Sequence, residues 1–111
     1  MAEPGASELD RIFHALSDQT RRSILLRMGD GEMTVSQIAE PYALTLAAIS
    51  KHLKVLDSAK LIERRKVGSY QMIRLNAETL MNARQWLDHY DRFWTERLNL
   101  LADMLEEKKS S

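Results

Sequence analysis

The first 58 residues carry apolar positions with the period of an α-helix. A stripe at i, i+3, i+4 and i+7 predicts a helix over 8–16, capped by Ser7 and built on Leu9, Ile12, Phe13 and Leu16. Three further helices are expected to begin at residues typical of N-caps, namely Asp18, Thr34 and Thr45. The last of these has Leu46, Ile49, Leu53 and Leu56 as its buried edge.

Two β-prone runs follow this helical region. Residues 61–67 and 70–75 flank the pair Gly68-Ser69, and this pattern is typical of a two-stranded hairpin. Three consecutive basic residues, Arg64, Arg65 and Lys66, stand next to its tip. Such charges can either discourage edge pairing of the sheet or contact phosphates. We favour the phosphate interpretation because a lysine-bearing helix precedes the hairpin.

A long helix is predicted over 77–107, after the cap residue Asn76. Its apolar positions cover an arc of about 160°, wider than the roughly 100° stripe of a helix that covers a single core. The surplus is expected to meet a second copy of the chain, because two-fold homodimers are the commonest oligomers. The alternative is a ligand pocket among the ring-bearing residues Trp86, Tyr90, Phe93 and Trp94.

The charges are distributed unevenly. The chain has 16 basic and 16 acidic residues and a formal net charge of zero, which on its own argues against nucleic acid. However, residues 45–74 hold seven basic and two acidic residues, a net charge of +5. Residues 1–44 carry −3 and residues 75–111 carry −2. The positive excess therefore falls on the fourth helix and the hairpin, as a local phosphate-binding patch requires.

Length and composition limit the possible functions. A chain of 111 residues predicts one domain, at 8–107, with flexible ends at 1–7 and 108–111. The absence of cysteine excludes disulfides and thiolate chemistry. No apolar run is long enough to span a bilayer and the first residues do not resemble a signal peptide, so we expect a cytoplasmic protein. No nucleophile–base pair or Gly-rich phosphate loop is present, which argues against an enzyme.

Three stretches of the chain resemble one bacterial family over about residues 8–105. They are Phe13-His14-Ala15-Leu16-Ser17-Asp18-Gln19-Thr20-Arg21-Arg22, then Ile49-Ser50-Lys51-His52-Leu53-Lys54-Val55-Leu56, then Leu61-Ile62-Glu63-Arg64-Arg65. Their order and spacing are similar to those of the ArsR/SmtB-type winged helix-turn-helix repressors. The later run Phe93-Trp94-Thr95-Glu96-Arg97-Leu98 resembles the metal-independent branch of that family.

The resemblance implies a mainly α fold with a β-hairpin. It consists of a helix-turn-helix at 34–57, a two-stranded wing at 61–75 and a dimerisation helix at 77–107. It further implies a homodimer that represses its own or a neighbouring operon by binding double-stranded DNA at a palindromic operator. The residues that fall at DNA-contacting positions are Thr45, Ala47, Ala48, Ser50, Lys51, His52, Lys54, Arg64, Arg65, Lys66, Gly68 and Ser69. The resemblance makes the fourth helix, which begins at Thr45, the recognition helix that enters the major groove, and His52 is also expected to help dock it.

The dimer interface implied by the resemblance uses the first and last helices. Its expected residues are Leu9, Ile12, Phe13, Leu87, Tyr90, Trp94, Leu98 and Leu101. Metal-sensing relatives carry thiols at the third helix or Asp and His pairs on the last helix, whereas this chain has no cysteine and offers only Asp88, His89 and Asp91. We therefore expect no metal and no cofactor, and the sequence names no small-molecule effector. The alternative function is a protein–protein interaction module that keeps the fold without binding DNA.

Overall fold

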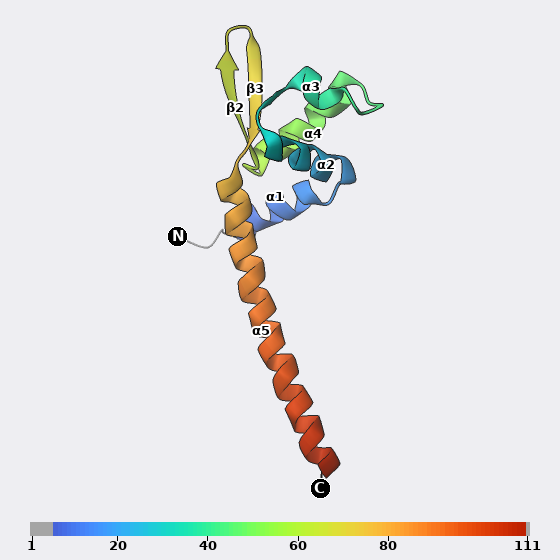
Figure 1. The fold of residues 1–111 in the computed structure, drawn as a ribbon, viewed down its shortest axis with the longest axis vertical. Coiled ribbons are helices and arrows are strands. Elements are labelled where there is room, and N and C mark those ends of the chain that lie inside the picture. Colours follow the sequence, from blue (N-terminus) through green and yellow to red (C-terminus); the bar gives the residue numbers. More distant parts are fainter. Residues whose placement is uncertain (1–5, 111) are drawn as a thin grey trace.

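The computed structural model describes the backbone of residues 6–110 and the side chains of residues 7–107. Within this range, a body of short helices and a small sheet carries one long helix that projects away from it (Figure 1). The wing lies at one end of the molecule and the carboxyl end of the long helix lies at the other. The predicted flexible ends at residues 1–5 and 111 lie outside the described residues, whereas residues 6, 7 and 108–110 are helical.

Helices α1 (Ala6–Leu16) and α2 (Gln19–Arg27) begin the body. Ser7 lies inside α1, so its prediction as the cap is wrong. Asp18 is confirmed as the N-cap of α2, because its Oδ2 accepts the backbone N–H of Arg21 at 3.0 Å. A 3₁₀ turn, η1 (Met28–Asp30), and Gly31 with φ 135° then end this helical segment.

The helix-turn-helix consists of α3 (Val35–Ala39) and α4 (Leu46–Ser58). Thr34 caps α3 in a reciprocal capping box with Gln37, as its spacing predicts. Thr45 caps α4, since its Oγ1 accepts the N–H of Ala48 at 3.1 Å. These side-chain caps satisfy backbone donors that have no partner within the helices and fix where α3 and α4 begin.

The sheet has three antiparallel strands, β1 (Met33–Thr34), β2 (Ile62–Val67) and β3 (Tyr70–Leu75), in the order β1-β3-β2. The hairpin of β2 and β3 was predicted, with Gly68 at φ 60° in its turn. The expectation of only two strands is wrong, because β1 pairs with β3 through Met33 and Ile73. A two-residue strand is too short to show the alternating pattern by which strands are recognised.

The core lies between the helices and the inner side of the sheet. Seven large side chains are fully buried there: Ile24, Ile38, Ile49, Leu53, Leu56, Leu61 and Ile73. They come from α2, α3, α4, β3 and the residue before β2, so one apolar cluster joins the helix-turn-helix to the wing. This cluster holds α4 in a fixed orientation on the body.

Helix α5 (Ala77–Ser110) leaves the body after its first turns. Leu80 and Ala83 pack on the core, whereas every described residue from Leu87 to Glu107 is exposed. The molecule measures 74 × 33 × 25 Å and its radius of gyration is 19.7 Å, against about 13 Å for a compact domain of this length. Among the described residues, no helix combines the length and apolar character needed to cross a membrane.

Candidate nucleic-acid interface

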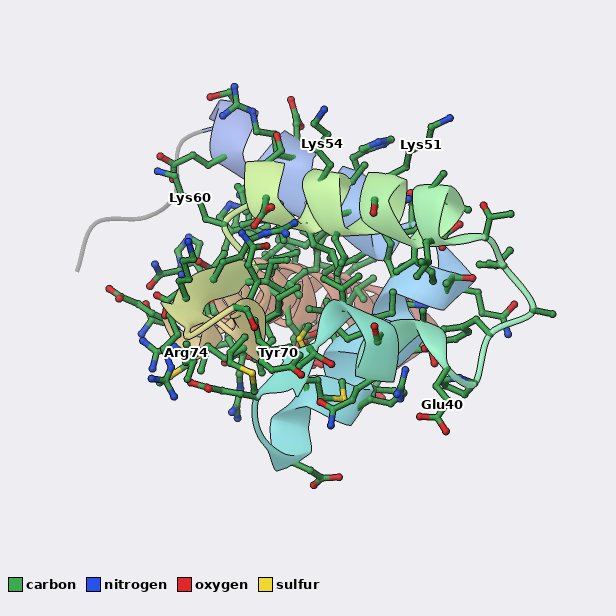
Figure 2. The ribbon with its side chains drawn as sticks, turned by 90° about the horizontal axis from the view of Figure 1, so that it is seen from above. Glu40, Lys51, Lys54, Lys60, Tyr70 and Arg74 are labelled. Atoms are coloured by element: carbon green, nitrogen blue, oxygen red, sulfur yellow. The ribbon has the colours of Figure 1, made fainter. Side chains whose placement is uncertain are left out.

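The outward face of α4 is free of the rest of the body. Ile49, Leu53 and Leu56 point into the core, and the opposite side of the same helix carries exposed residues, namely Ala47, Lys51, Lys54 and Ser58. Figure 2 shows Lys51 and Lys54 projecting away from the body on the side of α4 and α1. Small residues beside lysines leave room for another surface to approach the helix closely.

A polar cluster beneath α4 holds it against α1 and α2. The guanidinium of the buried Arg21 donates to the carbonyls of Ala15 (2.7 Å) and His14 (2.9 Å) at the end of α1. Its Nη1 also lies 3.2 Å from Nδ1 of His52 on α4. This single side chain therefore links α1 to α4.

The carboxylate of Asp18 completes this cluster. Its Oδ2 lies 3.8 Å from Nδ1 of His52. The backbone N–H of Arg21 lowers the pKa of Asp18 below its ordinary value, and the nearby His52 acts in the same direction. His52 thus lies in this polar cluster, where its predicted role in docking the fourth helix places it. Its side chain is 21% exposed and lies on the flank of α4 that meets α1 and α2.

The remaining helix positions of the predicted DNA set are placed as follows. Ala47 and Ser50 are exposed, while Ala48 is half-buried on the flank that also carries His52. Thr45 is exposed at the start of α4, but its Oγ1 already accepts the capping hydrogen bond. Thr45 is therefore positioned at the helix start, with its hydroxyl hydrogen free to donate elsewhere.

Two of the three wing cations are engaged in ion pairs within the chain. Arg64 Nη2 lies 2.6 Å from Oδ2 of Asp57 on α4, and Arg64 Nη1 donates to Gln71 at 3.2 Å. Arg65 makes a bidentate pair with Glu32, at 2.8 and 2.9 Å. Sequence reasoning placed both arginines beside phosphates but missed these carboxylates, one of which is 33 residues away.

The Arg65–Glu32 pair also shifts the ionisation of both partners. The side-chain hydrogen bond from Arg65 lowers the pKa of Glu32 below its ordinary value. The same hydrogen bond raises the pKa of Arg65. Both effects favour the charged forms, so this pair fixes the wing to the segment before β1 at neutral pH.

Lys66 is the one of these three wing cations that has no ion-pair partner among the described residues. It shares one face of the hairpin with Arg64, because side chains alternate along a strand, and that face meets α4 through Asp57. Within the part of the chain that the structure describes, Lys51, Lys54 and Lys66 form no ion pair. Gly68 and Ser69 lie exposed at the tip of the wing.

Two basic positions of α1 also belong to this surface. Arg11 and His14 line a groove of about 490 Å³ whose other wall contains Lys51 and Lys54 of α4. Sequence reasoning missed Arg11 and His14 here, because nothing local shows that α1 runs beside α4. The one signal that could have pointed to them is the helical period, which places both on the side of α1 away from its apolar stripe.

The predicted dimer residues divide into two groups. Ile12 is 3% exposed and belongs to the core of its own chain, and Leu9 is also buried, so these two predicted interface residues offer little surface to a partner. Phe13, Leu87, Tyr90, Trp94, Leu98 and Leu101 are exposed by 38–61%. An isolated chain leaves these large apolar side chains in water.

The aromatic residues of α5 form a continuous strip that starts at α1. Phe13 packs edge-on against Trp86, whose ring stacks on Tyr90 with centroids 5.3 Å apart. Tyr90 contacts Trp94, and Trp94 contacts Phe93. The guanidinium of Arg97 lies 4.0 Å above the Phe93 ring. The rings pack edge to face or stack along the helix, and each still exposes part of its surface.

No group of three or more potential metal-ligating side chains occurs among the described residues. Asp88 is 3.9 Å from Arg84, an i,i+4 ion pair on an exposed face. The arrangement therefore offers a basic helix face with a nearby wing and an apolar helix strip.

Comparisons with known proteins agree with this geometry. A helix-turn-helix domain family matches residues 16–65. The HTH-type transcriptional regulator Rv2034 of Mycobacterium tuberculosis is 35% identical over 89% of this chain and 90% of its own length. The transcriptional repressor SdpR of Bacillus subtilis is 34% identical over 71% of this chain and 88% of its own.

Solved structures extend the likeness to the fold. An ArsR-like transcriptional regulator from Rhodococcus sp. RHA1 has a TM-score of 0.80 and 32% identity, covering 88% of this chain and 92% of that one. The homodimeric winged helix-turn-helix DNA-binding domain Mb0332 of Mycobacterium bovis has a TM-score of 0.63 and 26% identity, covering 82% and 91%. The chain belongs to the ArsR family of winged helix-turn-helix transcriptional regulators.

Proposed function

We propose that this protein is a homodimeric, cytoplasmic transcriptional repressor that binds a palindromic operator, of its own or a neighbouring operon. The observation that carries the proposal is the exposed face of α4, where Lys51 and Lys54 have no ion-pair partner among the described residues. The relative SdpR is named a repressor and the Mb0332 domain is described as homodimeric, which supports both parts.

The recognition helix provides the contacts with bases and phosphates. With Ala47, Ala48 and Ser50 at its first turns, α4 can enter the major groove without steric obstruction. Ser50 can donate to a base edge, and the alanines can pack against a thymine methyl. Lys51 and Lys54 then neutralise the phosphates that border the groove, and Arg11 extends the positive surface along α1.

The wing contributes mainly through Lys66 and the turn at Gly68 and Ser69. Arg64 and Arg65 act first as supports, because their carboxylate partners fix the hairpin to α4 and to the segment before β1. Lys66 is free to reach a phosphate from the face that meets α4. This division of roles refines the expectation that the three wing cations, Arg64, Arg65 and Lys66, contact DNA.

Dimerisation follows from the projecting half of α5. A helix that extends from a body with this much exposed apolar surface gains stability when a second copy covers it. The strip from Phe13 to Leu101 is the surface we assign to that contact. Two recognition helices related by the two-fold axis then match half-sites about 34 Å, or roughly 10 base pairs, apart.

Selection of bound fragments from the source genome tests the proposal. We expect enrichment of a palindromic site near the gene itself or a neighbour. Lys51→Glu should weaken operator binding. It should also reduce the slope of the logarithm of the binding constant against the logarithm of the salt concentration, by the equivalent of about one phosphate contact per protomer. Arg92→Glu, which makes the same charge change on an exposed site of α5, should leave affinity unchanged. Absence of any enriched site, with intact dimers, would instead favour the protein–protein module.

A further inference from the structure

A polar cavity of about 260 Å³ lies on the body, apart from the aromatic strip and at the C-terminal end of α4, where it shares Ser58 with the outward face of that helix. It is formed where the start of α1, the end of α4 and the start of α5 meet. Four charged residues line it: Glu8, Arg11, Lys60 and Glu78. Two are cationic and two are anionic, so the cavity has no net charge.

These four charges do not pair with one another. Within the described residues, no ion pair of up to 4.0 Å involves any of them, although all four border the same small space. Arg11 also borders the basic groove on the other side of α1. The cavity can therefore bind a molecule that carries one positive and one negative group, because an acidic side chain is available for the first and a basic side chain for the second.

A buried acceptor in the cavity wall also lacks a partner. Asn82 of α5 lines the cavity, and its Oδ1 is buried without accepting a hydrogen bond. It is the one buried side-chain oxygen or nitrogen of this kind among the described residues. Buried polar atoms are normally hydrogen-bonded, and an exception calls for a partner that the chain itself does not provide. Because Oδ1 itself is closed to solvent, a ligand reaches it only after the Asn82 side chain turns toward the cavity, where an ammonium group would satisfy it.

Lys60 adopts a conformation that favours glycine. Its φ is 58°, in the left-handed region, at the position after the C-cap of α4 where glycine is usual. The N–H groups of Lys60 and Leu61 bond to Asp57 and Leu56 in the pattern of a Schellman motif, and Thr79 donates to the Lys60 carbonyl at 2.6 Å. A lysine at this strained position indicates a use for its side chain, which lines the cavity.

We propose that this cavity binds a small zwitterion, of the class of free α-amino acids, as an effector. Its volume equals that of roughly nine water molecules, which suits a ligand of about ten non-hydrogen atoms or fewer. The carboxylate faces Lys60 and Arg11, and the ammonium group faces Asn82 Oδ1 with Glu8 or Glu78. Figure 2 shows Lys60 on the side of the molecule that carries α1 and α4.

The position of the site couples it to DNA binding, and this part rests on the proposed function. Lys60 directly follows the recognition helix, while Asn82 belongs to the helix assigned to dimerisation. A ligand that bridges them favours one arrangement of α4 relative to α5. If that arrangement differs between free and operator-bound dimers, ligand and operator must change each other's affinity by the same factor.

Thermal unfolding of the full chain without DNA tests the binding site. The probes are the twenty proteinogenic L-amino acids, each beside the matching amine or carboxylic acid with only one charged group. At least one amino acid should raise the melting temperature at millimolar concentration, and its single-charge analogues should not. If none of the twenty produces a shift, the proposal is wrong.

Two variants tie the shift to the cavity. Lys60→Gly relieves the backbone strain and should unfold at the same temperature as the parent chain, or higher, while losing the ligand shift. Asn82→Leu keeps the number and branching of the side-chain heavy atoms but removes the acceptor, and it should also lose the ligand shift. Arg92→Met, on an exposed site of α5, should keep it. A shift that persists in both cavity variants would overturn the assignment.

Operator affinity, measured with and without the effective amino acid, tests the coupling. We expect at least a fivefold change in the operator Kd, lost in Lys60→Gly, and an equal change in the Kd of the ligand when operator is added. Ligand binding with no change in operator affinity would retain the site but refute its regulatory role. Failure of operator binding itself, with the thermal shift intact, would count against the proposed function alone.

Discussion

Replacement of Trp94 by alanine should separate the dimer. Trp94 lies in the middle of the projecting helix, where its ring contacts only Tyr90 and Phe93 among the aromatic residues described. Its side chain is 45% exposed in the single chain. Neither ring contact belongs to the core of the body, so the substitution should leave that fold intact and act on association.

The magnitude follows from the exposed area. A tryptophan presents roughly 250 Å², so 45% exposure leaves about 110 Å² for a partner to cover. At about 25 cal/mol per Å², complete coverage contributes about 3 kcal/mol per protomer and about 6 kcal/mol per symmetric dimer. If only half of that area is covered, the loss is about 3 kcal/mol, or roughly a 100-fold higher dimer Kd.

Sedimentation equilibrium over a range of concentrations measures this change directly. The control is Arg92→Ala, because Arg92 lies almost opposite Trp94 on the helical wheel and is exposed. It should leave the dimer Kd unchanged, and circular dichroism should show equal helix content in both variants. If Trp94→Ala dimerised with the Kd of the parent chain, the assignment of this strip to the dimer would be refuted.

Three further predictions follow from the ion pairs and the buried guanidinium. Lys66→Gln should weaken operator binding by roughly tenfold per dimer, about 1.4 kcal/mol, whereas Arg65→Gln should act mainly on stability. Gel-shift titration and thermal unfolding of both variants separate the two effects. Equal losses of DNA affinity in the two variants would contradict the division of roles. Because the pKa of Glu32 is lowered in the folded chain, its pair with Arg65 stabilises the fold fully above the ordinary glutamate pKa of about 4.3, and this contribution is lost as the pH falls through the lower, folded value. The difference in melting temperature between the parent and Glu32→Gln should therefore shrink from pH 6 to pH 3, and a constant difference would show that the pair does not stabilise the fold. Arg21→Met should lower the free energy of unfolding by about 3 kcal/mol in urea denaturation, because it leaves two carbonyls of α1 without their donor. Arg22→Met, whose exposed side chain bonds one carbonyl, should cost much less, and equal losses would contradict the role given to Arg21.

Local signals in the sequence were enough to predict most of the elements. The caps at Asp18, Thr34 and Thr45 depend on a side chain three residues from its backbone partner, so they can be read without knowing the fold. The hairpin and three of the four inward positions predicted for α4 follow from periodicity in the same way, whereas the prediction that Leu46 is buried is wrong, since it is 60% exposed. The +5 segment likewise identified the helix and wing that form the basic surface.

Only the tertiary structure decided which charges remain available. Arg64 and Arg65 look equivalent to Lys66 in the sequence, but their carboxylate partners belong to α4 and to the segment before β1. Ile12 lies on the same apolar stripe as Phe13, yet packing buries the first in the core and leaves the second 38% exposed. The cavity at Lys60 likewise needs three elements that lie far apart along the chain.

The physical reason is the range of the interactions. Capping and amphipathic period act over three or four residues, so the sequence itself determines them. Ion pairing, burial and cavity formation depend on which distant side chains the folded core brings within a few ångströms. The sequence therefore determined the helices, the hairpin and the basic segment of this regulator. Folding decided which of its cations are free for DNA and which support the wing.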